Sequence, residues 1–404
     1  MLKFDPNDLE SIADPYLLFS EIRRGGAVER LESGFWMITG HAAALEALHH
    51  PSCGSSPIAM RYLEGLPAGA ARDEMSNRIN FLDPPDHPRV RSIVSKAFTP
   101  RRTTLLRPWM EEAASALLDD LADEAEVDLL HRFAHQLPSL VISEMLGVPP
   151  ADRDRLTGWS DAVAPLLGVR VSPPRKAAAI AAAEEFHAYL GELLDERTRR
   201  PGDDLLSALL AAEAEGERLT RVELLSLAAT LYSAGHRTTR DLFTNGMSVL
   251  LSEPARYRSV VEGRWSIVSV VAEFLRYETP TLFVARVPLE PVTIGGVDIG
   301  AWEPILVFLA AANRDPAEYA EPDAFWPERG GGTPISFAFG AHFCLGASLA
   351  RSEAEVMLAA VTSRWPDLKL HPSHRLRWHQ RGPFRGLDEL IVVPGLDRKP
   401  GHSQ

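Results

Sequence analysis

The sequence predicts a mainly α-helical fold with a small β-rich part. Segments rich in Ala and Leu run through most of residues 110–250, and this composition favours helices. Within that region the capping-box pattern Thr220-Arg-Val-Glu223 opens a helix that continues to about Leu251, long enough to cross the molecule. The strand-like stretches are short and fall into three groups, at about residues 27–40, 290–310 and 367–395.

The N-terminal elements follow from short apolar patterns and turn residues. We expect a helix over residues 15–24 and two strands over 27–31 and 35–39. Residues 53–80 mix Gly, Pro and Ser with isolated apolar residues, so the pattern there is looser. The next helix is expected to begin at Asp86 as its N-cap, since Pro is accepted in the first turn that follows.

The later elements follow from the same kinds of pattern. Segments rich in Ala and Leu predict helices over 110–123, 128–147, 151–167 and 175–199. A further helix over 266–277 ends before a proline, and a Gly-Gly turn predicts a hairpin over 292–299. Short strands are expected at 304–310, 368–370 and 390–393.

The composition of the chain limits the classes of function that we expect. The chain has 404 residues, 45% of them apolar and 24% charged, as in ordinary globular proteins. Two cysteines cannot build a disulfide framework, and no signal-peptide or membrane-spanning stretch is found, so we expect a cytoplasmic protein. A net charge of −13 argues against nucleic acid as the general partner.

The chemistry centres on the stretch from Phe337 to Gly346, which contains Cys344. The cysteine precedes a helical pattern, and the unpaired N–H groups of a helix N-terminus favour the thiolate, which is the form that binds metals. Gly340 and Gly346 would let a flat macrocycle lie against the backbone, and His342 could donate to a carboxylate at its edge. The alternative is an inert buried cysteine.

The order F-x-x-G-x-H-x-C-x-G in this stretch resembles the haem-binding signature of the cytochrome P-450 family. The resemblance is to the soluble bacterial-type members and covers residues 15 to 395. It implies one P-450 haem domain over residues 1–404, with haem b between the long central helix and the cysteine loop. Cys344 would be the fifth iron ligand, whose electron donation favours O–O bond cleavage. Phe337, Gly340, His342 and Gly346 would surround the haem.

Two further motifs resemble haem-binding elements of the family. His87 and Arg91 match its H-x-x-x-R element, and Arg286 lies in a segment that passes beside the haem, so all three would bind haem propionates. The E-x-x-R pair of Glu273 and Arg276, with Arg329 of the later meander, would form a structural triad that holds the cysteine loop.

The middle of the long helix carries one departure from the family. Ala234 and Gly235 match the A/G-G-x-D/E-T pattern beside the haem, and Thr238 matches the threonine that takes part in oxygen activation and proton delivery. Arg237 replaces the usual acid, and a guanidinium does not titrate in proteins.

A buried arginine must find a carboxylate or water. We expect Arg237 to pair within the protein, with Asp241, Glu184 or Glu185 as candidates. A carboxylate on the substrate or a solvent-facing side chain are the alternatives.

Other positions are assigned by the family's layout. The expected pocket residues, for which ordinary packing is the alternative, are Met60, Leu63, Met75, Ile79, Tyr232, Leu282, Phe283, Val284 and Phe384. Residues 89–107 carry six basic residues and no acid, which indicates a docking surface for an acidic ferredoxin or flavodoxin, with a solvated basic face as the alternative.

Together these features predict a haem-thiolate monooxygenase that hydroxylates or epoxidises an apolar small molecule in natural-product or antibiotic metabolism. We expect it to act as a monomer. One alternative is oxidative coupling, rearrangement or peroxide-driven chemistry, which Arg237 favours. A more remote alternative is a haem-binding protein without turnover.

Overall fold

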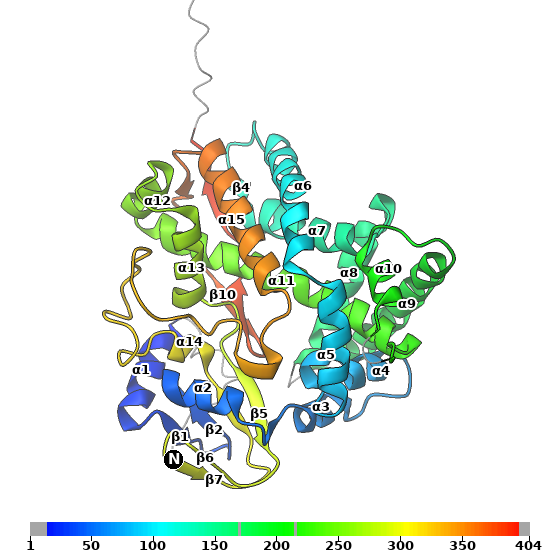
Figure 1. The fold of residues 1–404 in the computed structure, drawn as a ribbon. Coiled ribbons are helices and arrows are strands. Elements are labelled where there is room, and N and C mark those ends of the chain that lie inside the picture. The colour runs from blue at the N-terminus through cyan, green and yellow to red at the C-terminus, as the bar shows by residue number, and fades with distance from the viewer. Residues whose placement is uncertain (1–13, 169–170, 214–215, 396–404) are drawn as a thin grey trace, which may run out of the picture.

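Helix α11 (Arg221–Ser252) runs through the centre of the protein, and other helices pack on its sides (Figure 1). Its 32 residues span about 48 Å at about 1.5 Å per residue. Thr220 accepts a hydrogen bond from the N–H of Glu223, and the Glu223 carboxylate accepts one from the N–H of Thr220, so the predicted capping box is present. This computed structural model describes residues 14–168, 171–213 and 216–395.

The helices before α11 lie on several sides of the structure, from α1 and α2 at the lower left to α6 at the top and α8–α10 at the right (Figure 1). They are α1 (Pro15–Gly25), α2 (His41–His49), α3 (Ser56–Leu63), α4 (Ala70–Asn77), α5 (Asp86–Ala97), α6 (Pro100–Asp119), α7 (Gln136–Leu146), α8 (Arg153–Val163), α9 (Pro173–Arg199) and α10 (Leu205–Ala211). Those after it are α12 (Pro254–Val261), α13 (Ile267–Tyr277), α14 (Leu309–Ala312) and α15 (Ala347–Arg364). Helices α15 and α6 lie against each other.

The strands are short and lie in four small sheets. The largest has the order β1-β2-β8-β5-β3, with β2 and β8 parallel and the other pairs antiparallel. Its strands are β1 (Val28–Arg30), β2 (Trp36–Ile38), β3 (Cys53–Gly54), β5 (Val284–Pro288) and β8 (Ile305–Val307). The others are the hairpin β6 (Val292–Ile294) and β7 (Val297–Ile299), the hairpin β10 (Trp378–Arg381) and β11 (Phe384–Leu387), and the sheet of β4 (Val127–Asp128), β12 (Ile391–Val393) and β9 (Lys369–Leu370).

The predicted fold class is confirmed, and three local predictions need correction. Residues 53–80 are more regular than expected, because they contain the short helices α3 and α4, each of which buries part of its surface against its neighbours. The expected helix over 128–147 begins as strand β4, followed by a π-helical turn at Leu130–Ala134. Asp86 is the first residue of α5 and not its N-cap, since no side-chain cap bond is made there.

The core has two main parts that hold the site between them. The largest apolar cluster joins α11 to the helices packed on it, and a second cluster lies between the five-stranded sheet and α2. The cysteine loop draws on both, because Phe337 packs against the first cluster while Ala338 belongs to the second.

Candidate functional site

The loop before α15 is held by its own backbone. The N–H of Phe343 donates to the carbonyl of Gly340 at 3.1 Å, and the N–H of Cys344 donates to the carbonyl of Phe337 at 3.0 Å. Gly340 has φ +71°, and a Cβ there would lie 2.6 Å from the Leu48 carbonyl oxygen, so only glycine fits. From α15, the guanidinium of Arg351 lies over the Phe337 ring at 4.6 Å.

Cys344 faces open space within this loop. The residue is exposed in the protein chain, and a Cβ on Gly346 would meet no atom within 4 Å, so a flat group has room beside both. Solvent reaches the side chain through this space, but the protein around it partly desolvates the thiol and raises its pKa, while the N–H of Gly346 and the charges of Arg91 and Arg351 act against this. Binding a metal would release the thiol proton.

Four basic side chains gather at one edge of this space. The rings of His87 and His342 lie 4.1 Å apart, and Nη2 of Arg91 donates to the carbonyl oxygen of Phe343 at 2.8 Å. Burial, then Arg286 and His87, lower the pKa of His342 to about 3, and burial lowers the pKa of Arg286.

Few acidic groups lie near the charged side chains of this edge, Arg91 and Arg286. Asp83 is near, but its carboxylate accepts the backbone N–H groups of Ser55 and Ser56. Nδ1 of His342 is buried and has no hydrogen-bond partner among the residues that the structure describes. An anionic ligand at this edge would satisfy the cluster, and the two propionates of a haem fit it. The thiol, the open space and the cationic edge together fit a haem.

The central helix presents its predicted residues as follows. Ala234 is exposed although it lies in the middle of α11, and Thr238 is half-buried one turn later. The Thr238 hydroxyl donates to the Ala234 carbonyl at 2.9 Å. A Cβ on Gly235 would lie 3.4 Å from the side chain of Ile142 on α7, which is ordinary contact.

Arg237 pairs with an acid that the sequence did not single out. Its Nε lies 3.9 Å from Oδ1 of Asp161 on α8. Pairing within the protein was therefore the right expectation, but the named partners were wrong. Asp241 accepts from Arg240 at 2.8 Å, while Glu184 accepts from the N–H of Ala70 and Glu185 accepts from Trp159, so each of these acids has another partner.

A fully buried acid also escaped the sequence analysis. Glu353 on α15 is 1% exposed, and burial raises its pKa well above the ordinary range, more than a hydrogen bond with Thr239 lowers it. It is therefore a neutral carboxylic acid beside α11. The signal that could have found it is an acid on the apolar face of the helix after Cys344.

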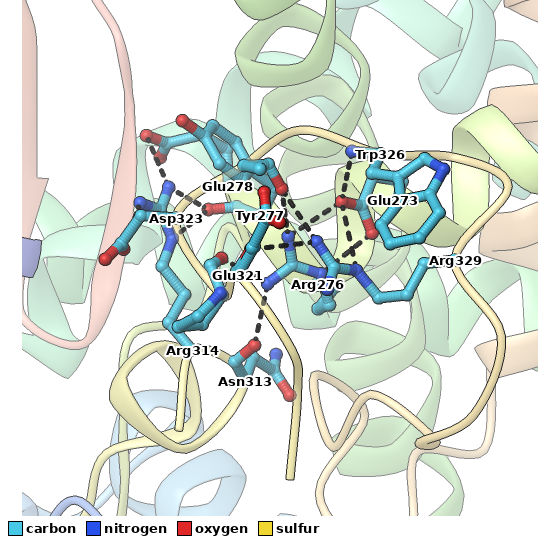
Figure 2. A network of polar contacts seen from close by, with 12 residues as sticks. Glu273, Arg276, Tyr277, Glu278, Asn313, Arg314, Glu321, Asp323, Trp326 and Arg329 are labelled. Carbon is cyan, nitrogen blue, oxygen red and sulfur yellow. Dashed lines mark hydrogen bonds and ion pairs between the residues drawn. The ribbon is translucent and has the colours of Figure 1, made fainter. Parts of the chain in front are cut away.

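The side chains of the predicted triad, Glu273, Arg276 and Arg329, lie together as expected (Figure 2). Arg276 donates to both oxygens of Glu273 at 2.8 and 2.7 Å, and its other nitrogens reach the carbonyls of the meander. Arg329 lies 3.7 Å from the same carboxylate, which also accepts the N–H of Trp326 at 2.8 Å.

Asn313 connects this network to the cysteine loop. Its Oδ1 accepts the N–H of Ile335 at 2.8 Å, and its Nδ2 donates to Ser336 at 2.7 Å. Because Ile335 and Ser336 directly precede Phe337, the triad and Asn313 fix the start of the loop that carries Cys344.

Several predicted pocket residues are packed in the interior. Met75 and Tyr232 are 0% exposed and Leu282 is 2% exposed, so these three are corrected to core residues. Tyr232 bonds with Ser143 and Thr157 between α7 and α8, on a face of α11 away from the site. The other positions, which differ in exposure, stay predictions: Met60, Leu63, Ile79, Phe283, Val284 and Phe384.

The basic stretch is less free than its composition indicates. Arg89 pairs with Glu223, Arg102 lies 3.8 Å from Asp203, and Arg107 pairs with Glu355 at 2.9 Å. The acids come from distant segments, so the run of six bases overstated the net local charge. Lys96 and Arg101 are exposed.

A family model described as Cytochrome P450 matches residues 267–372. Among characterised proteins, the chain is 36% identical over 398 residues to the cytochrome P450 monooxygenase PikC of Streptomyces venezuelae, covering 96% of this chain and 93% of that protein. It is 34% identical over 401 residues to the 6-deoxyerythronolide B hydroxylase of Saccharopolyspora erythraea, covering 95% and 98%.

Solved structures of the same kind superpose on it. The structure of CalO2 gives a TM-score of 0.93 at 28% identity and covers 98% of this chain and 99% of its own. P450BioI, solved with an acyl carrier protein that carries hexadec-9Z-enoic acid, gives 0.87 at 31% identity, covering 96% and 100%. Within residues 14–168, 171–213 and 216–395, none of the helices combines the length and apolarity that crossing a membrane requires.

Proposed function

The chain belongs to the cytochrome P450 family, an oxidoreductase family with a haem cofactor, and we propose on this basis that it hydroxylates or epoxidises an apolar natural product. Three relatives are named for such compounds: the 6-deoxyerythronolide B hydroxylase, the mycinamicin IV hydroxylase/epoxidase and the polyketide biosynthesis P450 PksS. The substrate class we propose is therefore a polyketide or a similarly apolar compound.

The observation that carries this proposal is that the Cys344 thiol faces open space whose edge is lined by basic side chains. Cys344 would bind the haem iron through its sulfur, and His87, Arg91, Arg286 and His342 would hold the propionates. When bound, the haem supplies the activation of dioxygen and the oxidation of the substrate.

The rest of the work falls to the protein's own residues. The exposed Ala234 leaves room above the site, and the Thr238 hydroxyl, held by the Ala234 carbonyl, can pass a proton from water without leaving the helix. Glu353, whose raised pKa favours the protonated form, lies beside the next threonine of α11 and can donate its proton.

The electron donor we propose is an acidic ferredoxin or flavodoxin. The exposed Lys96 on α5 and Arg101 on α6 offer positive charge, and Arg91, on the same helix as Lys96, bonds to the carbonyl of Phe343. Two exposed apolar side chains, Leu105 of α6 at 70% and Phe343 at 38%, would complete a docking surface.

A second function, coupling or rearrangement without oxygen insertion or peroxide-driven oxidation, is favoured by one observation. Arg237 stands where the family has an acid, and its own partner Asp161 lies on α8. A site with fewer titratable groups suits a reaction that needs fewer protons.

Turnover under labelled dioxygen separates these functions. The haem-loaded protein is titrated with a panel of macrolactones, other polyketides and fatty acids while the Soret band is followed, and each binder is then incubated with ferredoxin, its reductase and NADPH. We expect a product that gains one labelled oxygen atom, at a rate that falls as salt is added, because exposed charges are screened over about 10 Å at about 0.1 M salt.

Other outcomes assign the alternatives. A product without added oxygen indicates coupling or rearrangement, and turnover with hydrogen peroxide but not with ferredoxin indicates a peroxide-driven enzyme. A rate independent of salt contradicts the basic docking surface.

A further inference from the structure

Three potential metal ligands from three separate elements meet beside α11, away from the cysteine loop. They are His135, the residue before α7, Asp161 of α8 and His236 of α11. Their ligand atoms all lie within 4.8 Å of one another. Oδ2 of Asp161 is 3.7 Å from Nε2 of His135, and Oδ1 is 3.5 Å from Nε2 of His236.

The hydrogen bond of His236 determines which of its nitrogens is available. Nδ1 lies 3.1 Å from the Tyr232 carbonyl oxygen, and because a carbonyl only accepts, Nδ1 must carry the proton. In the neutral ring, Nε2 then points its lone pair at the Asp161 carboxylate. Two acceptors that face each other at 3.5 Å need a cation between them, either a second ring proton or a metal ion.

The hydrogen bonding of His236 is of the kind found around metal sites. A ligating histidine usually donates its other nitrogen to a carbonyl or carboxylate, as His236 does to the Tyr232 carbonyl. The Asp161 carboxylate faces both imidazoles, one with each oxygen.

We propose that His135, Asp161 and His236 bind one divalent transition-metal ion of the Zn²⁺ class, with water in the fourth position. A tetrahedral Zn²⁺ site places neighbouring ligand atoms about 3.3 Å apart. The distances of 3.5 and 3.7 Å join the two histidines to different oxygens of Asp161, and the three ligand atoms lie within 4.8 Å of one another, so the side chains must draw together when one ion binds. Two imidazoles and a carboxylate suit Zn²⁺, Cu²⁺ or Ni²⁺ better than Mg²⁺ or Ca²⁺.

The surroundings leave room for the water ligand. His135 and Asp161 line a cavity of about 240 Å³, and their side chains are 15% and 42% exposed, so an ion can enter from this side. The His236 side chain, at 0% exposed, forms the inner wall.

Two arginines that line the same cavity, Arg237 and Arg240, oppose a cation. Arg240 pairs with Asp241 at 2.7 Å, which offsets its charge. Nε of Arg237 is 3.9 Å from Asp161 Oδ1, longer than a hydrogen bond, and a carboxylate offers about four lone-pair sites. The carboxylate can therefore ligate an ion and face the guanidinium on its outer side. The ion would connect α8 to α11 and to the start of α7. It would therefore limit how far these helices can separate.

Zinc titration of the haem-loaded protein tests the proposal. After treatment with EDTA and dialysis, calorimetric titration with ZnCl₂ should show one site per chain, and zinc should raise the melting temperature in a way that EDTA reverses. His135→Gln and Asp161→Asn should each weaken zinc binding at least about tenfold, since even an outer partner of a metal site costs about 10–100-fold.

His131→Gln is the matched control. His131 lines the same cavity, but it pairs with Asp128 at 2.6 Å and its side chain is 58% exposed. The control should keep wild-type zinc affinity, and all variants should keep the carbon monoxide spectrum of the folded, haem-loaded protein. Because His236 is fully buried and its replacement would disturb packing, the test uses the two more exposed ligands.

Two results would contradict the proposed zinc site. In one, the wild type binds no zinc, and Asp161→Asn alone lowers the melting temperature, which identifies an imidazolium–carboxylate pair. In the other, His135→Gln, Asp161→Asn and His131→Gln bind zinc equally well, which means that zinc binds elsewhere on the protein.

Discussion

Arg91 donates a hydrogen bond from Nη2 to the carbonyl oxygen of Phe343 at 2.8 Å, and so ties α5 to the residue before Cys344. The two residues are far apart in sequence, and this contact brings the cationic edge of the site next to the thiol. The charge of Arg91 also acts on the pKa of Cys344. One side chain thus serves both the loop and the proposed propionate site.

Replacing Arg91 should loosen the haem. Arg91→Lys keeps a positive charge but loses the planar fork that reaches both a carbonyl and a carboxylate. Loss of a hydrogen bond to a charged group is worth about 1.5–3 kcal/mol, so haem release to an apo acceptor protein should be about 10–150-fold faster. Arg89→Lys, on the same helix but paired with Glu223, should release haem at the wild-type rate. Equal rates for both variants would contradict the role of Arg91.

Replacing Cys344 should remove the spectral signature of a thiolate ligand. Reduced wild-type protein under carbon monoxide should show the strongly red-shifted Soret band, and Cys344→Ser and Cys344→His should not. Cys53→Ala is the matched control, because Cys53 is the other cysteine and is buried in β3. Survival of the band in either Cys344 variant means that another residue is the ligand.

The triad should act on stability and not on chemistry. Arg276 is 1% exposed and donates two hydrogen bonds to Glu273. Arg276→Leu therefore leaves a buried carboxylate unpaired and should lower the free energy of unfolding by about 3–5 kcal/mol. Arg377→Leu breaks an exposed pair with Glu389 and should cost about 1 kcal/mol or less. Denaturation curves and haem content measure both changes. Similar losses for the two variants would mean that the triad does not hold the cysteine loop.

The arginine at position 237, where the family has an acid, should change the coupling of the enzyme, which is the amount of product formed per NADPH. We expect Thr238→Ala to lower the product formed per NADPH several-fold, because its hydroxyl passes protons, and Arg237→Glu to change the same ratio. Thr244→Ala is the control, since its buried hydroxyl donates along α11 to the Arg240 carbonyl. If Arg237→Glu changes neither coupling nor substrate affinity, Arg237 is structural.

The buried acid Glu353 should make stability depend on pH. Its pKa is raised in the folded state, so the native protein binds the proton more tightly than the unfolded chain does. Stability is therefore fully present below the unfolded pKa of about 4.5 and falls as the pH rises toward the folded pKa, by up to about 1.4 kcal/mol per pH unit.

Glu353→Gln should remove this dependence. The melting temperature of the variant relative to the wild type should rise steadily from about pH 5 to about pH 8, because the amide never ionises. A difference that stays constant over this range would show that Glu353 is not held protonated.

The sequence alone determined the features that are local in the chain. The capping box at Thr220, the helix it opens and the glycine at position 340 depend on neighbouring residues, and each is present as predicted. The ten-residue signature around Cys344 was likewise sufficient to indicate the family, because its chemistry is contained in one loop.

Tertiary structure decided which side chains face one another. Arg237 pairs with Asp161 on α8 and not with Asp241 one turn away, and Tyr232 faces the core between α7 and α8, on the side of α11 opposite to the exposed Ala234. A helix repeats every 3.6 residues, so its sequence shows which residues share a face but not which element covers that face. The meeting of His135, Asp161 and His236, and the burial of Glu353, depend on that covering and could be seen only in the folded chain.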